Sequence, residues 1–368
     1  MLHAAAPAGS ALAYWAGACQ ARHAKCTVKA WQNFDVVAAF EPPPPATYSV
    51  RVIPKSFKAH GLNSAGSAVG VAYGGPADAN GDAFLFDGAN GQTSYLPFSS
   101  GEASYAQGIN DRNVLVVNVL GPSSNRTVRW DGGVATDLGT IGPPGGNTWG
   151  YAINALDQVV GWFSSTSADG TLKYDRAFLH DGQRMIDLGS LDGTCSEAHA
   201  VNLARTAVGG SCAGNRAMHA VVFHPGASIE DLTPEGYGMA EAISDSGYIV
   251  GRSGTDGFLR APDGSMRNVG SLPGGTMSWL VGVNDRGIAV GMGYVPSYFA
   301  QGDTHQGEAG QAPRAAVWMK GRLWDLAYMT GRDDLRLYEA YAINGAGQIL
   351  VQGFLPNADG YAFLLTPR

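Results

Sequence analysis

The sequence predicts an all-β protein, a seven-bladed β-propeller with four antiparallel strands in each blade. Three observations lead to this fold class. One short motif returns seven times at intervals of about 47 residues, a spacing typical of propeller blades. Each copy carries the signals of a β-hairpin and is followed by further short strands. Glycine makes up 52 of the 368 residues, about twice its usual share, which suits a fold with many turns.

The motif predicts the hairpin between the first two strands of each blade. Its form is small-x-small-aliphatic-Asn-x-x-Gly-x-aliphatic-Val-Gly, and YAINALDQVVG at residues 151–161 is one copy. The Asn side chain can cap a type I turn, and Gly three residues later supplies the left-handed conformation that such a turn needs. The seven copies centre on Asn63, Asn110, Asn154, Asn202, Ser244, Asn284 and Asn344.

The fourth turn position is glycine in four copies, at residues 66, 247, 287 and 347. Asn113 stands there in the second copy, and asparagine tolerates positive φ better than most residues. Asp157 and Arg205 fit less well, so we expect those two turns to differ from the others.

A third strand is expected after each hairpin, at residues 83–86, 128–130, 177–179, 220–223, 258–259, 315–318 and 362–365. A turn and a fourth strand follow, as at residues 136–138, 186–188 and 324–326. The seventh unit lacks a fourth strand, because the chain ends at Arg368. We expect residues 48–54 to fill that place and close the ring, which leaves no open sheet edge. The propeller would then span residues 48–368, preceded by a tail of residues 1–47 with a Pro-rich spacer.

The repeats resemble the HAF family of extracellular repeats, over about residues 48–367. That family combines the Asn-x-x-Gly hairpin with a His-Ala-Phe strand and an Asp-Leu-Gly segment. His219-Ala220-Val221 is the nearest match to the triplet, and Asp137-Leu138-Gly139 and Asp187-Leu188-Gly189 keep the third element. The resemblance implies a secreted or periplasmic protein. It implies an architecture and no particular active site.

Charge and hydropathy exclude several partners. The formal charge is −7, the pI is about 5.6, and Lys and Arg form no run, so nothing points to nucleic acid or to an anionic membrane surface. Gly, Pro, Asp or Asn interrupts every apolar segment before it reaches the length of a membrane span. We expect a monomer without nucleic-acid or membrane partners.

The four cysteines predict disulfides. In the fourth hairpin, opposed residues have numbers that add to about 408, which places Cys195 and Cys212 face to face. We predict a disulfide there, and an oxidising compartment. Cys19 and Cys26 are expected to form a second one, since a single His between them leaves a metal site short of ligands.

One position in the repeat stands out as a candidate site. The first strand of a propeller blade borders the central channel. The position three residues before each central Asn or Ser is large and mostly polar, while its neighbours are almost all Ala or Gly. It is occupied in turn by His60, Gln107, Tyr151, His199, Glu241, Val281 and Tyr341. Either these side chains pack between blades, or they form a polar pocket at the channel mouth.

A pocket of this kind is compatible with several functions. The main prediction is a site for a glycan or another polar small molecule, with binding residues His60, Gln107, Glu241, Trp149, Trp279 and Tyr298. No cofactor is certain, but His60, His199 and Glu241 could bind a divalent metal ion. The rival reading is a lyase or hydrolase in which Tyr151 or Tyr341 acts with His199 as acid and base, for instance in β-elimination next to a uronic-acid carboxylate. A third is a protein-interaction scaffold.

Aromatic residues in expected loops support the glycan reading. The connection at residues 291–313 in the sixth blade is long and contains Tyr298, and one in the third blade contains Trp162, Phe163 and Tyr174. Trp149 and Trp279, together with Tyr237, are expected in loops that enter first strands. Aromatic faces stack on the apolar C–H face of a sugar ring.

Overall fold

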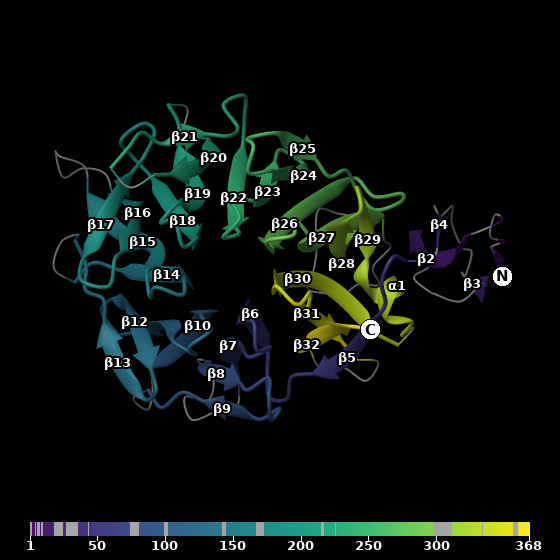
Figure 1. Cartoon of the computed structure of the whole chain (residues 1–368), viewed down its shortest axis with the longest axis horizontal. Coiled ribbons are helices and arrows are strands. Elements are labelled where there is room, and N and C mark those ends of the chain that lie inside the picture. The colour runs from purple at the N-terminus through teal and green to yellow at the C-terminus, as the bar shows by residue number, and fades with distance from the viewer. Residues whose placement is uncertain are drawn as a thin grey trace.

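The computed structural model of the chain is a closed ring of seven blades (Figure 1), each a four-stranded antiparallel sheet. The prediction of a seven-bladed all-β propeller is therefore confirmed. The structure describes residues 44–73, 81–98, 102–141, 145–166, 173–214, 217–224, 226–296, 311–332, 334–355 and 360–368, with residues 2, 3, 5, 8, 10–17, 25, 26 and 36–42 near the start.

Within each blade the strands follow one another from the centre of the ring outward. Blade one contains β6 (Lys58–Leu62), β7 (Ala68–Ala72), β8 (Asp82–Phe86) and β9 (Thr93–Tyr95). Blade two contains β10 (Ala103–Ile109), β11 (Leu115–Leu120), β12 (Asn125–Asp131) and β13 (Val134–Asp137). Blade three contains β14 (Thr148–Ile153), β15 (Val159–Thr166), β16 (Lys173–His180) and β17 (Met185–Gly189). Blade four contains β18 (Ser196–Val201), β19 (Ala207–Cys212), β20 (Met218–Phe223) and β21 (Glu230–Asp231).

The remaining blades repeat this order. Blade five contains β22 (Gly238–Ile243), β23 (Ile249–Ser253), β24 (Asp256–Arg260) and β25 (Met266–Asn268). Blade six contains β26 (Met277–Val283), β27 (Ala289–Pro296), β28 (Gln311–Met319) and β29 (Arg322–Asp325). Blade seven contains β30 (Arg336–Ile343), β31 (Ile349–Phe354), β32 (Gly360–Pro367) and β5 (Tyr48–Val52). Ahead of the ring, β1 (Leu2–His3) pairs with β3 (Lys25–Cys26), and β2 (Ala11–Gly17) pairs with β4 (Val36–Glu41).

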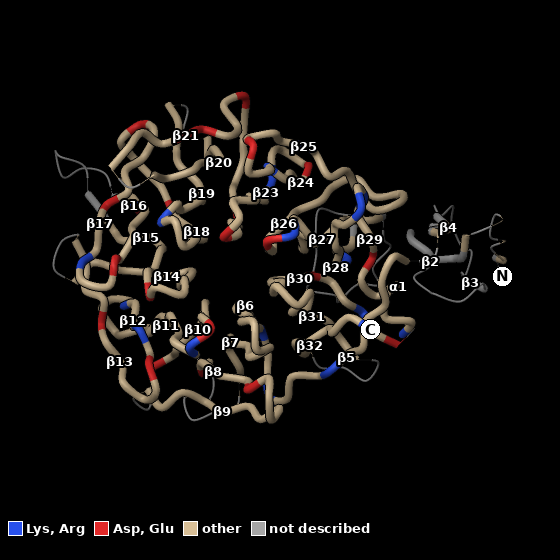
Figure 2. Tube along the Cα trace, in the orientation of Figure 1, with Lys and Arg blue, Asp and Glu red and all other residues tan. Residues whose placement is uncertain are grey.

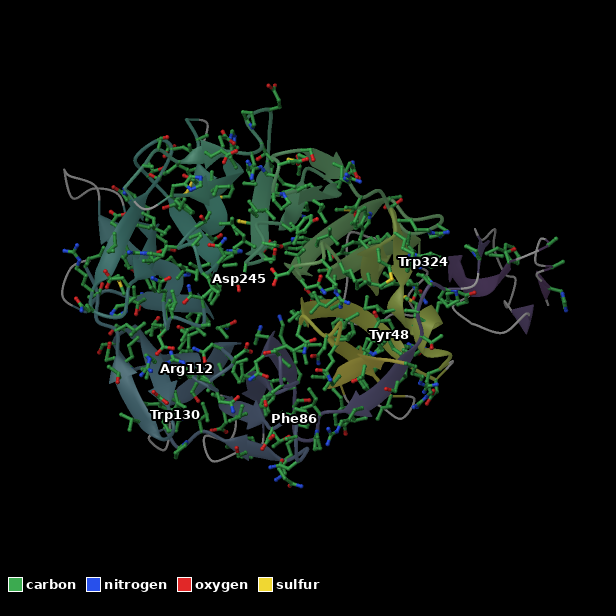
Figure 3. The ribbon with its side chains drawn as sticks, in the orientation of Figure 1. Tyr48, Phe86, Arg112, Trp130, Asp245 and Trp324 are labelled. Atoms are coloured by element: carbon green, nitrogen blue, oxygen red, sulfur yellow. A yellow bond between two sulfur atoms is a disulfide. The ribbon has the colours of Figure 1, made fainter. Side chains whose placement is uncertain are left out.

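The ring closes as the sequence predicts, with β5 as the fourth strand of blade seven. β5 runs antiparallel to β32, so that Tyr48 faces Pro367 and Val52 faces Phe363. Tyr48 is 2% exposed and lies in the core of blade seven (Figure 3), and Ile53 just beyond the strand is fully buried. The closing strand is thus anchored by side chains as well as by its hydrogen bonds.

The hydrophobic core lies mainly between neighbouring blades. Leu179 of β16 and Val221 of β20, for example, belong to one buried cluster that joins blades three and four. Small residues on the first strands, such as Ala198, let the sheets approach closely there and are fully buried. The blades therefore hold one another in place, which fixes their inner edges around the channel.

All seven turns between first and second strands have the same form. The four predicted glycines have positive φ, and so do Asn113, Asp157 and Arg205, at 58°, 60° and 65°. The expectation that the last two turns would differ is therefore wrong. In Asp157 the cost of this backbone conformation is offset by its carboxylate, which accepts a hydrogen bond from Asn110 Nδ2 at 2.8 Å and pairs with Arg129 at 2.7 Å.

The Asn of the motif also joins neighbouring blades, a role that the sequence analysis missed. Its side-chain oxygen caps the turn, as between Asn63 Oδ1 and the Ser67 N–H at 2.9 Å. Its side-chain nitrogen donates to the backbone carbonyl of the next turn at 2.9–3.5 Å, and this recurs for Asn63, Asn110, Asn154, Asn202, Asn284 and Asn344. Ser244 interrupts this belt, and there the Ser246 hydroxyl donates to the Asp285 carbonyl instead.

The position three residues before each motif Asn or Ser is a β-bulge in every blade. The register between first and second strands shifts there, as between Ala198 and Ala200, which leaves His199 as the extra residue. The same shift occurs at the other six positions. The bulged residue has no partner across the ladder, so its side chain is redirected relative to a regular strand.

Several details differ from the predicted elements. β15 and β16 extend through Trp162, Phe163 and Tyr174, which are strand residues and not loop residues. β27 and β28 likewise shorten the connection in blade six, and Tyr298 lies outside the described residues. A one-turn helix, α1 (Leu326–Thr330), follows β29 because Asp325 caps it by accepting hydrogen bonds from two backbone N–H groups.

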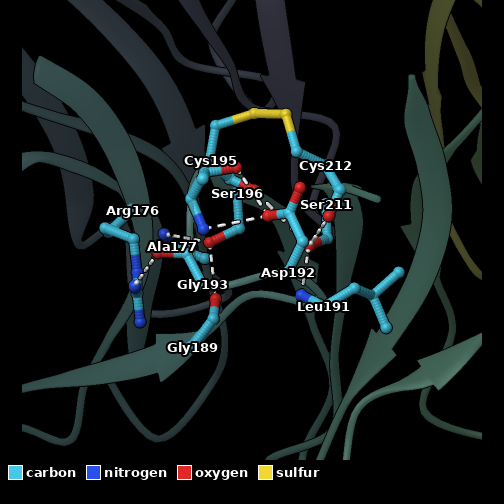
Figure 4. Close-up of a disulfide and its surroundings, with 11 residues drawn as sticks. Arg176, Ala177, Gly189, Leu191, Asp192, Gly193, Cys195, Ser196, Ser211 and Cys212 are labelled. Carbon is cyan, nitrogen blue, oxygen red and sulfur yellow. Dashed lines mark hydrogen bonds between the residues drawn. A yellow bond between two sulfur atoms is a disulfide. The ribbon is translucent and has the colours of Figure 1, made fainter. Parts of the chain in front are cut away.

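Cys195 and Cys212 form the predicted disulfide, with their Cα atoms 5.2 Å apart (Figure 4). The bond ties the start of β18 to the end of β19. Next to it, Ser196 and Ser211 are opposed in the ladder, and the Cys212 N–H donates to the Cys195 carbonyl at 2.8 Å. Cys19, of the second predicted disulfide, lies outside the described residues.

Loss of this disulfide should destabilise blade four. It closes a loop of 17 residues, so we expect Cys195→Ser with Cys212→Ser to lower the free energy of unfolding by about 3 kcal/mol. Chemical denaturation of the variant and of the wild type, with and without reductant, measures this. Reductant should lower the free energy of unfolding of the wild type and leave that of the variant unchanged. A variant as stable as the oxidised wild type would contradict the expectation.

Candidate functional site

The channel is lined by three alternate positions of the seven first strands. Counting back from the motif Asn or Ser, the last strand position is aliphatic, the third is the bulge, and the fifth carries Lys58, Tyr105, Trp149, Glu197, Met239, Trp279 and Glu339. We call the end of the channel where the chain enters these strands the entry end, and the other the turn end. The polar and aromatic side chains thus belong to the entry half of the channel.

Five residues from four consecutive blades form one group linked by hydrogen bonds and ion pairs, the His199 cluster. His199 Nδ1 lies 2.7 Å from Glu241 Oε2, and its Nε2 lies 3.5 Å from Glu197 Oε2. The Tyr151 hydroxyl donates to Glu197 at 3.3 Å, and Trp279 Nε1 donates to Glu241 at 3.0 Å. The Tyr151 and His199 rings are 4.6 Å apart between centroids. The cluster is therefore a fixed arrangement that links blades three to six.

Burial and neighbouring charge act in opposite directions on His199. Only 16% of its side chain is exposed. Burial alone would lower its pKa, but the carboxylates of Glu241 and Glu197 outweigh that effect and raise the pKa of His199 to about 10. His199 is therefore an imidazolium at neutral pH, flanked by two carboxylates. Its buried Nε2 has no hydrogen-bond partner of good geometry among the described residues.

A second group, the Tyr341 cluster, lies where blades seven and one meet. The Tyr341 hydroxyl hydrogen-bonds to Glu339, and the His60 ring packs edge-on at 5.8 Å from the Tyr341 ring centroid. Lys58 Nζ lies 5.1 Å from the same centroid. Burial, together with Lys58, lowers the pKa of His60 to about 3, so this histidine is neutral. Burial raises the pKa of the Glu339 carboxyl.

The structure brings together some predicted site residues and separates others. Tyr151, His199 and Glu241 meet in the His199 cluster, whereas His60 and Tyr341 meet in the other. At the bulge position, Val281 in blade six and Gln107 in blade two separate the residues of one cluster from those of the other. Trp149 and Trp279 lie in β14 and β26 rather than in entering loops. Tyr237 directly precedes β22 and is 43% exposed.

Three charged residues were missed by the sequence analysis: Lys58, Glu197 and Glu339. All three occupy the fifth position before the motif Asn. The two glutamates supply hydrogen-bond acceptors to Tyr151 and Tyr341. Strand alternation could have pointed to this position, since residues two apart on a strand share a face. The β-bulge at the third position interrupts this alternation. The sequence pattern therefore pointed to the third position and not to the fifth.

The predicted acid–base pair is protonated on both sides in this structure. Burial raises the pKa of the Tyr151 hydroxyl, and the carboxylate of Glu197 raises it further. His199 also holds its proton, for the reason given above. A base must be able to accept a proton at the working pH. Burial and the neighbouring carboxylates therefore keep the proton on both residues at neutral pH.

The predicted metal ligands do not fit a metal ion in this arrangement. His60 lies in the Tyr341 cluster, away from His199 in the ring order. A metal-binding imidazole must be neutral, whereas His199 is protonated and donates to Glu241. In the part of the chain that the structure describes, no three His, Cys, Asp or Glu side chains are arranged to hold one metal ion.

The turn end of the channel has a different character. A cavity of about 250 Å³ is lined there by aliphatic residues of the first strands and by turn residues such as Asp111, Asp245 and Asp285. Figure 2 shows acidic and basic residues bordering the central opening, and Figure 3 places Asp245 at the inner edge of the ring. Asp245 and Asp285 each accept a hydrogen bond from a backbone N–H of the neighbouring turn, with N···O distances of 2.8 Å, so they help to join the blades. None of the predicted site residues lines this cavity; those that the structure describes lie toward the entry end.

Comparisons with known proteins support the fold and go no further. No family model matches the chain, so the resemblance to HAF repeats stays a prediction. No curated protein matches it either. Among solved structures, an oligogalacturonate lyase from Vibrio parahaemolyticus is similar at 12% identity and a TM-score of 0.51, over 87% of this chain and 97% of that one.

Two further structures are similar at 12% identity and a TM-score of 0.42. One is a gluconolactonase from Xanthomonas campestris, with 87% of this chain and 90% of that one covered. The other is TolB from Acinetobacter baumannii, with 82% and 63% covered. Likenesses at this identity concern the fold alone. Among the described residues, no helix is long and apolar enough to cross a membrane.

Proposed function

We propose that the protein binds a glycan or a similar polyhydroxylated small molecule at the entry end of the channel, against the His199 cluster. The observation that carries the proposal is the linked set of charged and aromatic side chains from four blades. Two carboxylates and an imidazolium are held in place by one another, by Tyr151 and by Trp279. Such a set presents hydrogen-bonding groups to a ligand without first having to be ordered.

The chemistry of the cluster suits sugar hydroxyls. Carboxylates accept hydrogen bonds from hydroxyl groups, and these charge-assisted bonds are stronger than neutral ones. The Glu197 and Glu241 side chains are 24% and 12% exposed, so each keeps some surface toward the channel. Aromatic side chains contact both carboxylates, since the Tyr151 hydroxyl donates to Glu197 and Trp279 Nε1 donates to Glu241. A sugar ring can stack on an aromatic face while its hydroxyl groups donate hydrogen bonds to the neighbouring carboxylates.

The disulfide supports a place of action outside the cytoplasm. A bond between Cys195 and Cys212 persists in an oxidising compartment. It lies two residues before Glu197 on β18 and so helps to hold that carboxylate in place. We therefore infer that the protein acts as a secreted or periplasmic binder. An oligogalacturonate lyase is among the proteins of similar structure, which agrees with this proposal but does not carry it.

The proposal is tested by measuring glycan binding to the wild type and to matched variants. Isothermal titration with trigalacturonate, cellotriose and chitotriose should find at least one ligand. Glu241→Gln and Trp279→Ala are each expected to weaken its binding at least about tenfold, the effect of one charge-assisted hydrogen bond. Trp318→Phe, on the third strand of blade six, is the control and should leave affinity unchanged.

Two outcomes would overturn this proposal. One is that none of the three trisaccharides binds at millimolar concentration. The other is that binding survives both substitutions, which would place the ligand elsewhere on the ring. The same mixtures can be followed by ultraviolet absorbance for a newly formed C=C bond, because its appearance with trigalacturonate would support the lyase reading instead.

A further inference from the structure

Arg252, next to the His199 cluster, is held in place by aromatic rings. It lies on β23, and its guanidinium carbon is 4.5 Å from the Trp279 ring centroid and 4.9 Å from that of Tyr237. Tyr237 belongs to the same blade, whereas Trp279 belongs to blade six. The guanidinium is therefore fixed at the boundary between two blades by contacts that leave its N–H groups free to donate.

Among the residues that the structure describes, none is a carboxylate partner of Arg252. Other half-buried arginines do have one: Arg129 pairs with Asp157, Arg260 with Glu230, and Arg314 with Asp325. No described carboxylate lies within ion-pair distance of Arg252, and its buried Nε has no hydrogen-bond partner among the described residues. An unsatisfied buried donor is costly, about 1 to 3 kcal/mol, and such groups are rare in folded proteins. An anionic ligand could therefore supply the hydrogen-bond acceptor that the Arg252 guanidinium lacks among the described residues.

Trp279 connects this guanidinium to the proposed binding site. The edge of the indole donates from Nε1 to Glu241 at 3.0 Å, while its ring packs against Arg252. Arg252 and Glu241 thus lie against the same ring. A ligand on the His199 cluster that also carries a carboxylate would meet acceptors on one side and a free, oriented guanidinium on the other.

We propose that Arg252 is a specificity-determining residue that binds the carboxylate of an acidic sugar in this site. The inference rests on the proposed function and adds the substrate class. A planar guanidinium donates two parallel hydrogen bonds to a carboxylate, which a neutral hydroxymethyl group at the same carbon cannot match. The site should therefore prefer uronic-acid oligosaccharides to their neutral counterparts.

The test compares two ligands that differ only at this group. Trigalacturonate and the trisaccharide obtained by reducing its carboxyl groups to hydroxymethyl groups are titrated into the wild type, Arg252→Met, Arg252→Lys and Arg267→Met. Arg267 is the matched control, since it also belongs to blade five and lies 6.0 Å from an aromatic ring of blade six, that of Trp318, but on the outermost strand. Thermal unfolding of each variant checks that it folds.

The expected result is a selective loss. Wild type and Arg267→Met should bind the acidic trisaccharide about 10- to 100-fold more tightly than the neutral one, the range for hydrogen bonds to charged groups. Arg252→Met should abolish that preference while it changes neutral binding less than about threefold, and Arg252→Lys should keep part of it. Equal weakening of both ligands in Arg252→Met would overturn this inference and leave the proposed function standing. If the wild type binds neither ligand, the proposed function fails first.

Discussion

Removal of residues 1–53 should prevent the propeller from closing and leave it unfolded, or lower its melting temperature by at least about 10 °C. The deletion takes away β5 and with it the backbone pairing to β32. It also removes Tyr48 and Ile53, which are 2% and 0% exposed. Loss of two large buried side chains costs about 5 to 10 kcal/mol, comparable to the whole stability of a typical domain. Circular dichroism and thermal unfolding measure the effect.

A shorter deletion and a rescue variant separate β5 from the rest of the N-terminal segment. A chain without residues 1–44 keeps β5 and should unfold close to the wild-type temperature. Residues 45–56 can instead be moved behind Arg368 through a short turn, since the Arg368 N–H donates to the Thr47 carbonyl and Pro367 faces Tyr48. This permuted chain should fold again. Normal folding of the chain without residues 1–53 would show that β5 contributes little to closure.

The ring could be predicted because the residues of one local turn define the repeat. Asn63 and Gly66 specify a turn from four neighbouring residues, and the same four positions recur in each blade. Closure by residues 48–54 followed from a missing strand at the other end. Asp157 shows the limit of this reasoning, since its strained turn is stabilised by Arg129 and Asn110, which no local pattern could reveal.

The candidate site could be predicted only in part. His199 and Glu241 were found because they occupy the bulge position, whose neighbours are Ala or Gly in six of the seven copies. Glu197 was missed, although it contacts both Tyr151 and His199. The sequence also could not show protonation states, because these depend on distances between blades. The same residue type is an imidazolium in blade four and a neutral ring in blade one.

The two histidines should give the stability of the protein opposite dependences on pH. The pKa of His199 is about 10 in the folded protein, above its ordinary value of 6.5. Its contribution is therefore complete below pH 6.5 and is lost as the pH rises toward 10. The pKa of His60 is about 3, so its contribution is complete above pH 6.5 and is lost as the pH falls toward 3.

The measurement is the free energy of unfolding of His199→Gln and His60→Gln, each against the wild type, from pH 4 to pH 10. His199→Gln leaves Glu197 and Glu241 without their cation, and we expect a loss of about 3 kcal/mol near pH 6 that shrinks above pH 6.5. For His60→Gln the difference from the wild type should instead change only below pH 6.5, in favour of the variant as the medium becomes more acidic. If the His199→Gln difference stays constant from pH 6 to pH 10, His199 is neutral in the folded protein. His199 would then be available as a base, and this result would favour the lyase hypothesis over the glycan-binding hypothesis.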